Sequence, residues 1–227
     1  MSLVHRSLRV SVKPAQIRAA TFQGRKHLVF PVMACMEGVV HAMGSDAPEL
    51  VDFSVLQRTA DQWNGKPIVG GHPVVNGEPV SANDPDVYQA ETFGLMFLAG
   101  TNAETRKLEV TAYVDPAKAT TRIARDVVDR LERVMAGEDV QPIEVSIGAF
   151  VALSNESGEF KGKRYKRRWV DLTADHLALL ESGDRGACSI DMGCGVRAAQ
   201  ENDMTEQKSL RERLMSLVAA AFRANLS

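Results

Sequence analysis

Cysteine is scarce in this sequence, and its arrangement excludes the usual cysteine-based sites. The 227 residues include only Cys35, Cys188 and Cys194, and no two of them form a Cys-x-x-Cys pair. An odd number of cysteines without such a pair predicts free or buried thiols in a reducing compartment. The spacing of Cys188 and Cys194 is a poor match to that of zinc ligands. We therefore expect no metal and no cofactor.

The sequence also lacks long apolar runs and a large net charge. No run approaches the roughly 20 apolar residues that span a bilayer, and residues 1–12 lack the apolar core and cleavage site of a signal peptide. The formal net charge of −2 argues against a protein that coats nucleic acid. With 44% hydrophobic and 25% charged residues, the composition is that of a soluble globular protein. We expect no membrane partner.

What the sequence does contain is a series of short segments with strand character. Each is marked by alternation of apolar and polar residues or by a short apolar run between turn signals. The predicted strands cover residues 8–12, 27–36, 92–98, 107–114, 144–153 and 163–172. Residues 71–89, rich in proline, glycine, asparagine and aspartate, predict a long loop.

Three segments have helical spacing. Residues 52–64 place apolar side chains at helical intervals before a glycine, a typical C-terminal stop. A second helix is predicted to begin at Asp115-Pro116, because aspartate caps free amides and proline is tolerated at the first position, and to end at Gly137. Residues 203–227 predict a helix with one narrow apolar face.

These elements predict a mixed fold dominated by β-strands, either a β-barrel or a folded sheet, with helices packed outside it. A polar stretch over residues 198–208 places a boundary near residue 200. We therefore expect one domain of residues 1–200 and a helical tail of residues 201–227. The narrow apolar face of the tail fits either docking on a partner, as the start of a scaffold segment, or packing on its own domain.

Ser146 is the first candidate for chemistry. In residues 143–153 a period of two places an unbroken apolar row on one face of a strand. Ser146 then lies on the opposite face, between Glu144 and Gly148, and the glycine leaves room for a substrate backbone. Without partners, Ser146 would be an ordinary serine on a solvated face.

Two histidines and an arginine complete the set. His72 lies in a Gly-Gly-His-Pro loop, and an imidazole titrates near the pH at which a general base works; alone, it would be a surface histidine. His176 begins a segment that fits either a short helix or a strand, and Arg185 follows in Gly-Asp-Arg-Gly. A base, a nucleophile, an orienting group and an oxyanion stabiliser are the parts of a serine acyl-transfer site. The remaining histidines, which lack such settings, are His5, His27 and His41.

Residues 176–186, His-Leu-Ala-Leu-Leu-Glu-Ser-Gly-Asp-Arg-Gly, resemble the segment around the second catalytic histidine of herpesvirus assemblins. Residues 63–73 and 145–148 are similar to phage head-maturation proteases, which share the assemblin fold. The resemblance covers residues 8–197 and implies an assemblin-like β-barrel wrapped by helices, with a C-terminal helix added.

The resemblance also implies a role for each candidate residue. Assemblins have a Ser-His-His triad in the chain order His, Ser, His, as here. Ser146 would be the nucleophile, His72 its base, and His176 would orient His72 in place of the carboxylate of a Ser-His-Asp triad. Arg185 and the backbone N–H of Asp184 would stabilise the oxyanion. Assemblins carry two arginines where this chain has Asp184-Arg185, which places a carboxylate beside the developing negative charge.

The implied function is that of a phage prohead protease, a serine endopeptidase that cleaves scaffold and capsid-protein extensions and itself. It would act inside the assembling prohead, in the cytoplasm of the bacterial host. Its partners would be the scaffold and the major capsid protein, and a homodimer is compatible because assemblins are active as dimers. Ala198-Ala199 and residues 219–221 are candidate self-cleavage sites. The alternative is a capsid-assembly or scaffold protein that keeps the fold with little or no peptidase activity.

One basic run stands apart from these motifs. Its members lie within eight positions: Lys161, Lys163, Arg164, Lys166, Arg167 and Arg168. The simpler interpretation is a solvated hairpin with Tyr165 and Trp169 packed below it. The functional one is a dock for an acidic scaffold or for nucleic acid.

Overall fold

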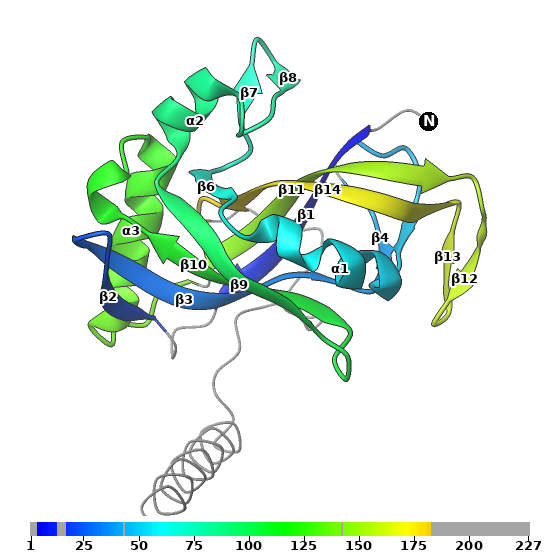
Figure 1. The fold of residues 1–227 in the computed structure, drawn as a ribbon, viewed down its shortest axis with the longest axis horizontal. Helices are drawn as coiled ribbons and strands as arrows, with labels where there is room; N and C mark the ends of the chain where they lie inside the picture. The colour runs from blue at the N-terminus through cyan, green and yellow to red at the C-terminus, as the bar shows by residue number, and fades with distance from the viewer. Residues whose placement is uncertain (1–3, 13–16, 43, 142, 183–227) are drawn as a thin grey trace, which may run out of the picture.

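The structure, a computed structural model, describes residues 4–12, 17–42, 44–141 and 143–182 of the chain. Within them, ten strands form one large mixed sheet, and Figure 1 shows helices α1, α2 and α3 around it. The main path of the sheet runs β1 (Val4–Val12), β11 (Ile143–Ser154), β14 (Arg167–Leu179), β6 (Pro67–Gly70), β9 (Gly94–Asn102), β10 (Lys107–Val114), β3 (Arg25–Met36) and β2 (Arg18–Phe22). Off this path, β5 (Glu49–Val51) pairs with β14 and with β4 (Gly38–Val40).

The predicted strand-dominated mixed fold is confirmed, but the sheet is not closed. β1 and β2 form the two ends of the path, and β1 also approaches β3. The described residues contain no ladder between β1 and β3. β3 pairs with β10 along one edge, and β2 covers Arg25–Val29 on the other. That part of its second edge is therefore not available to β1.

The core lies between the curved sheet and its helices. The largest fully buried side chains include Trp63, Trp169, Phe30, Phe93 and Leu131. The apolar row of β11 is buried as predicted from Ile143 to Val151. Burial of this row fixes the register of β11, because a slip of one residue would turn its apolar side chains to the other face.

The first predicted helix is present in two parts. The helix α1 (Phe53–Thr59) begins after Asp52, whose side chain accepts from the Ser54 N–H, and a 3₁₀ turn, η2 (Ala60–Trp63), continues it. Gly65 follows with φ of +77°, a left-handed conformation that glycine adopts at little cost. The N-cap and the C-terminal stop were therefore both predictable from residue type.

The second predicted helix begins later than the sequence indicated. Asp115 does cap a free amide, that of Ala117, but only a 3₁₀ turn follows, η3 (Pro116–Lys118). The helix α3 (Arg122–Met135) has Thr121 as its N-cap, accepting from the Ala124 N–H. The prediction of a start at Asp115 was wrong because two capping residues occur in succession, and only the second precedes a continuous helix.

The prediction that residues 71–89 form one long loop was wrong. They contain a small hairpin of β7 (Val74–Val75) and β8 (Glu78–Pro79), followed by α2 (Pro85–Glu91). Asp84 caps α2 with Pro85 at its first position, a combination that favours helix initiation. Figure 1 shows this segment standing above β6.

The partner of β11 is longer than residues 163–172. β14 extends to Leu179, so His176 lies on a strand and not on a helix. Lys163–Tyr165 instead form β13, which pairs with β12 (Gly158–Phe160) in the hairpin at the right of Figure 1. The strand alternative for His176 left open by its local sequence is thus the observed one.

The basic run lies on this hairpin and the start of β14. Tyr165 and Trp169 are buried, as predicted. Arg167 pairs with Asp46, and Arg168 pairs with Asp52 and Glu156. These two arginines are therefore engaged by acidic side chains of the same chain.

Some predictions fall outside the described residues, namely Asp184, Arg185, Cys188, Cys194, the self-cleavage candidates and the tail of residues 201–227. Cys35 is a buried free thiol, and burial raises its pKa to about 12. In the part of the chain that the structure describes, no helix has the length and apolarity needed to cross a membrane.

Candidate active site

Three neighbouring strands bring the candidate residues together. β14 pairs antiparallel with β11 and parallel with β6. Ser146 on β11 lies opposite Ala178, and His176 on β14 lies opposite Gly148. His72 follows the end of β6, which runs beside Leu177–Leu179. Residues far apart in the sequence thus meet at one end of three adjacent strands.

Two glycines shape the chain just before His72. A Cβ on Gly70 would lie 2.8 Å from the backbone nitrogen of Ala124 at the start of α3, so this close approach requires glycine. Gly71 has φ of +79°, and its N–H donates to the carbonyl of Leu179 at 2.9 Å. The Gly-Gly pair therefore ties the chain to β14 one residue before His72.

Ser146, His72 and His176 are joined by hydrogen bonds. Ser146 Oγ lies 2.7 Å from His72 Nε2, and His72 Nδ1 lies 2.8 Å from His176 Nε2. The two imidazole rings are inclined at 65°, with centroids 5.0 Å apart. Ser146 and His176 are fully buried, and His72 is half-buried. Although Ser146 lies on the face opposite the apolar row, that face is not solvated here.

Gly148 has a different role from the one its sequence position indicated. We expected it to leave room for a substrate backbone, but a Cβ at this position would overlap the His176 ring. The imidazole of His176 therefore occupies the space that the missing side chain of Gly148 leaves on β11. The absence of a side chain at Gly148 is a condition for the position of His176.

The hydrogen-bonded chain continues to Asp175, which the sequence analysis did not single out. His176 Nδ1 lies 2.7 Å from Asp175 Oδ2, and both side chains are buried. Successive residues of a regular strand point to opposite faces. A register shift between Gly148 and Ala149 leaves Asp175 as an extra residue of β14, and such a bulge re-aims side chains. We call Ser146, His72, His176 and Asp175 the relay.

Three donors from the segment after β8 hold the Asp175 carboxylate. The Ser81 hydroxyl and the Asn83 amide donate to Oδ1, and the backbone N–H of Ala82 donates to Oδ2 at 3.2 Å. The Asn83 amide also donates to the Asp175 carbonyl at 2.9 Å. A buried carboxylate is costly unless it is hydrogen-bonded in this way. The only sequence signal for it was an acidic residue directly before His176, in a segment in which polar and apolar residues otherwise alternate.

A further carboxylate, Glu91 at the end of α2, lies within electrostatic reach of the relay. Burial raises the pKa of Glu91 above its usual value, while the charge of His176 acts in the opposite direction. Glu91 is partly exposed, and its link to the relay is this charge interaction with His176.

The chain after β14 is fixed to α3 up to the last described residues. Arg130 is buried and donates to the carbonyl of Leu180 at 2.6 Å, and Arg122 forms a bidentate pair with Glu181. Arg185 and the backbone N–H of Asp184, the predicted oxyanion donors, lie outside the described residues. Their geometry relative to Ser146 therefore stays a prediction.

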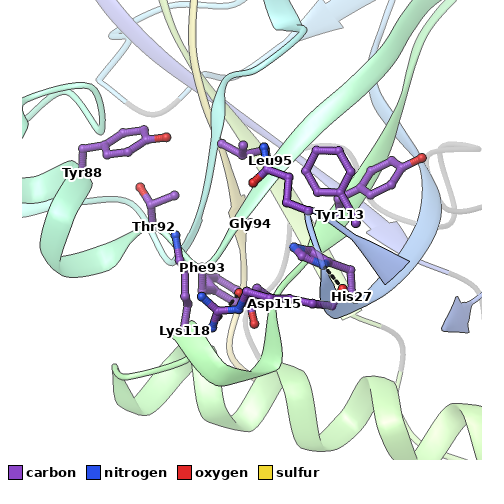
Figure 2. Close-up of a pocket in the computed structure, with 12 residues that line it drawn as sticks. His27, Tyr88, Thr92, Phe93, Gly94, Leu95, Tyr113, Asp115 and Lys118 are labelled. Carbon is purple, nitrogen blue, oxygen red and sulfur yellow. Dashed lines mark hydrogen bonds and ion pairs between the residues drawn. The ribbon is translucent and has the colours of Figure 1, made fainter. Parts of the chain in front are cut away.

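A cavity of about 80 Å³ lies beside the turn of the β2–β3 hairpin, away from the relay. Figure 2 shows Tyr88 and Thr92 on one side and Tyr113 and His27 on the other, with Asp115 below. The lining is part aromatic and part charged. None of its lining residues belongs to the relay.

The chemistry open to the relay is that of an activated hydroxyl. Among the residues that the structure describes, no group of three or more histidine, cysteine, aspartate or glutamate side chains is arranged to hold a metal ion. A serine hydroxyl within hydrogen-bond reach of an imidazole, oriented by a third group, is the arrangement of a nucleophile and its base. The geometry therefore defines a candidate serine acyl-transfer site.

No protein-family model, curated protein or solved structure matches this chain.

Proposed function

We propose that this protein is a serine hydrolase that uses Ser146 as its nucleophile. The observation that carries the proposal is the pair of contacts from His72, 2.7 Å to Ser146 Oγ and 2.8 Å to His176 Nε2. Nucleophile, base and orienting group lie within hydrogen-bond reach of one another. This preorganisation is what general-base activation of a hydroxyl requires.

The reaction would proceed in two half-reactions. Ser146 Oγ attacks the scissile carbonyl carbon while its proton passes to His72 Nε2, and the leaving amine departs with that proton. Water then attacks the acyl-enzyme, gives a proton to His72, and His72 returns it to Ser146 Oγ. His176 holds His72 in the required orientation throughout.

The particular function we propose is that of a phage prohead protease. The order His72, Ser146, His176 and the resemblance of residues 176–186 to assemblins support it, as does the strand-dominated fold. The proposal includes an assemblin-like barrel, from which the open sheet departs, and Arg185 with the Asp184 N–H as oxyanion donors. The substrates would be the scaffold and capsid-protein extensions inside the prohead, in the cytoplasm of the bacterial host, and the protease itself.

One observation favours a second candidate function. Ser146 is 0% exposed, so a substrate carbonyl reaches Oγ only after local opening of the site. A protein whose site stays closed would be a capsid-assembly or scaffold protein that keeps the fold with little or no peptidase activity. The two candidates differ in whether Ser146 ever becomes reactive.

Intact-mass spectrometry over hours on the wild-type chain and on Ser146→Ala tests the first candidate. We expect the wild type to shed a C-terminal piece and to gain the mass of a fluorophosphonate probe, and Ser146→Ala to do neither. Removal of the nucleophile abolishes turnover in enzymes of this kind. Cleavage by Ser146→Ala would rule out the assignment.

Ser154→Ala is the matched control. Ser154 lies on the same strand, and its hydroxyl has no hydrogen-bond partner in the structure, so its loss should change neither cleavage nor labelling. A wild-type chain that neither cleaves nor takes up the probe, with its capsid partner present, would favour the assembly protein.

A further inference from the structure

The relay has four members, and Asp175 lies at the end opposite Ser146, in contact with His176. We propose that Asp175 is a positioning residue that fixes the tautomers of both histidines and thereby makes His72 Nε2 an acceptor toward Ser146. The inference rests on the proposed function for its kinetic consequences. Its structural content, the placement of two protons, is independent of any activity.

The direction of the hydrogen bonds follows from the chemistry of Asp175. An ionised carboxylate only accepts hydrogen bonds, so His176 Nδ1, 2.7 Å away, carries the proton and donates. In a neutral imidazole the other nitrogen is then an acceptor. His176 Nε2 accordingly accepts from His72 Nδ1–H, which leaves His72 Nε2 free to accept from Ser146 Oγ–H.

Without Asp175 this direction would be undetermined. Either histidine could donate in the hydrogen bond between His72 and His176, because each neutral ring has one donor and one acceptor. In the opposite arrangement His72 Nε2 would carry a proton and could not serve as the base. The buried carboxylate at one end of the chain removes that alternative.

The donors around Asp175 keep it in the ionised form. Three donors converge on its two oxygens: the Ser81 hydroxyl, the Ala82 N–H and the Asn83 amide. Hydrogen bonds to the charged form of a carboxylate favour that form. They also come from the segment that begins at His72, so one segment supplies both the base and the clamp on the far end of the relay.

The charge of Asp175 would also act on the imidazolium that forms during the reaction. A positive charge on His72 is stabilised through His176 by the carboxylate beyond it, as a triad aspartate does directly. Two other carboxylates lie on this side of the site: Glu91 on α2 and Glu144, two residues before Ser146 on β11. The variants described below keep Glu91 and Glu144, so any change in tautomers or in the pH profile comes from Asp175 and its donors.

Asp175→Asn tests the proposal. The amide has one oxygen and one nitrogen. The Ser81 hydroxyl and the Asn83 amide both donate at the Oδ1 position, so the amide oxygen takes that position and the nitrogen faces His176 Nδ1, which must then accept. We expect ¹⁵N-resolved imidazole spectra of full-length Ser146→Ala to show Nδ1–H on both His72 and His176, and Asp175→Asn added to that background to lose this pattern. In the active background we expect kcat/KM to fall about 10–100-fold, the usual effect of removing an outer-shell partner.

The pH profile separates positioning from a merely structural role. Loss of the negative charge makes the imidazolium less favourable, so the acid limb of kcat/KM should move to lower pH while the plateau falls. Asp175→Asn with wild-type tautomers and an unshifted acid limb would overturn the proposal. Correct tautomers in a protein without peptidase activity would overturn the proposed function and leave this inference standing.

Ser81→Ala provides the second variant if Asp175→Asn fails to fold. It removes one donor to Asp175 and keeps the carboxylate, the Ala82 N–H and Asn83. We expect folded protein, retained tautomers and a loss in kcat/KM smaller than that of Asp175→Asn. A larger loss than that of Asp175→Asn, or an altered tautomer pattern, would show that the clamp and not the charge sets the protons, against the proposal.

Discussion

Two buried carboxylates with different partners lie at opposite ends of β14: Glu49 on the neighbouring strand β5, and Asp175 on β14 itself. At the first end, next to the parallel strand β5, Glu49 accepts from the Trp169 indole N–H at 2.8 Å and from the Ser45 hydroxyl at 2.7 Å. At the second end, next to the parallel strand β6, Asp175 accepts from an imidazole. Both carboxylates are almost completely inaccessible, at 0% and 1%.

The difference between the ends lies in the partners and not in the burial. The indole and hydroxyl that donate to Glu49 hold their protons near neutral pH, and Arg167, 4.0 Å from Glu49 Oε1, stays charged. An imidazole exchanges a proton in this range, and His176 passes its influence to His72 and Ser146. A buried carboxylate therefore becomes part of a reactive site when its partner can titrate and leads to a nucleophile.

Gly148→Ala should disrupt the second end of β14 most strongly. The added methyl overlaps the His176 ring, so the ring must move, and misplacement of about 1 Å costs about 100-fold in rate. Overpacking also costs about 1–3 kcal/mol of stability. Cleavage assays and urea unfolding measure the two effects.

Gly100→Ala is the control for this substitution, because a Cβ at Gly100 meets nothing within 4 Å. It should leave both the cleavage rate and the urea midpoint unchanged. Full activity of Gly148→Ala would show that the His176 position is not needed.

Glu49→Gln should affect the first end alone. The amide retains one acceptor oxygen, but its nitrogen is a donor that faces either the Trp169 N–H or the Ser45 hydroxyl, both of which donate in the wild type. A buried polar group is then left poorly paired, at a cost of about 1–3 kcal/mol. We expect a lower urea midpoint with the wild-type cleavage rate. Slower cleavage with an unchanged urea midpoint would contradict the conclusion that Glu49, unlike Asp175, has no part in the reaction.

Arg168→Gln is the mildest change, at the half-buried start of β14 near Glu49. Burial alone would raise the pKa of Asp52, but hydrogen bonds and the charge of Arg168 lower it below its usual value. A carboxylate with a lowered folded-state pKa stabilises the protein above its unfolded pKa of about 3.9 and loses that contribution as the pH falls further. We expect a loss of about 0.5–1 kcal/mol at pH 7 that shrinks as the pH falls below about 4, toward the lowered folded-state pKa of Asp52.

Urea unfolding at several pH values measures this difference, with Arg164→Gln as the control within the basic run. Arg164 is exposed on β13, and its substitution should have no pH-dependent effect. A deficit in Arg168→Gln that does not shrink as the pH falls further below about 4 would mean that the loss does not come from the Asp52 charge.

Local patterns in the sequence were sufficient for much of the fold. The alternation of β11 predicted its buried row because only one register hides all of those side chains, and Asp52 and Gly65 predicted the limits of the α1–η2 segment. Prediction failed where two local signals competed. Asp115 and Thr121 both cap free amides, and only packing of the following residues selects the longer helix.

For the candidate site, the sequence supplied residue types and an order. It identified Ser146, His72 and His176 as a set through their resemblance to a family, but it left the structure of the His176 segment open. It did not connect Asp175 with His176, because neighbours on a regular strand do not share a face.

The sequence by itself determined a strand-dominated chain with a hydroxyl, two imidazoles and capped helices, since these follow from residue chemistry and short-range periodicity. Only the tertiary structure decided that the sheet stays open, that Gly148 makes space for His176, and that a bulge turns Asp175 toward it. Those outcomes depend on pairing between segments far apart in the chain. The register of β11, β14 and β6 therefore decides which side chains meet.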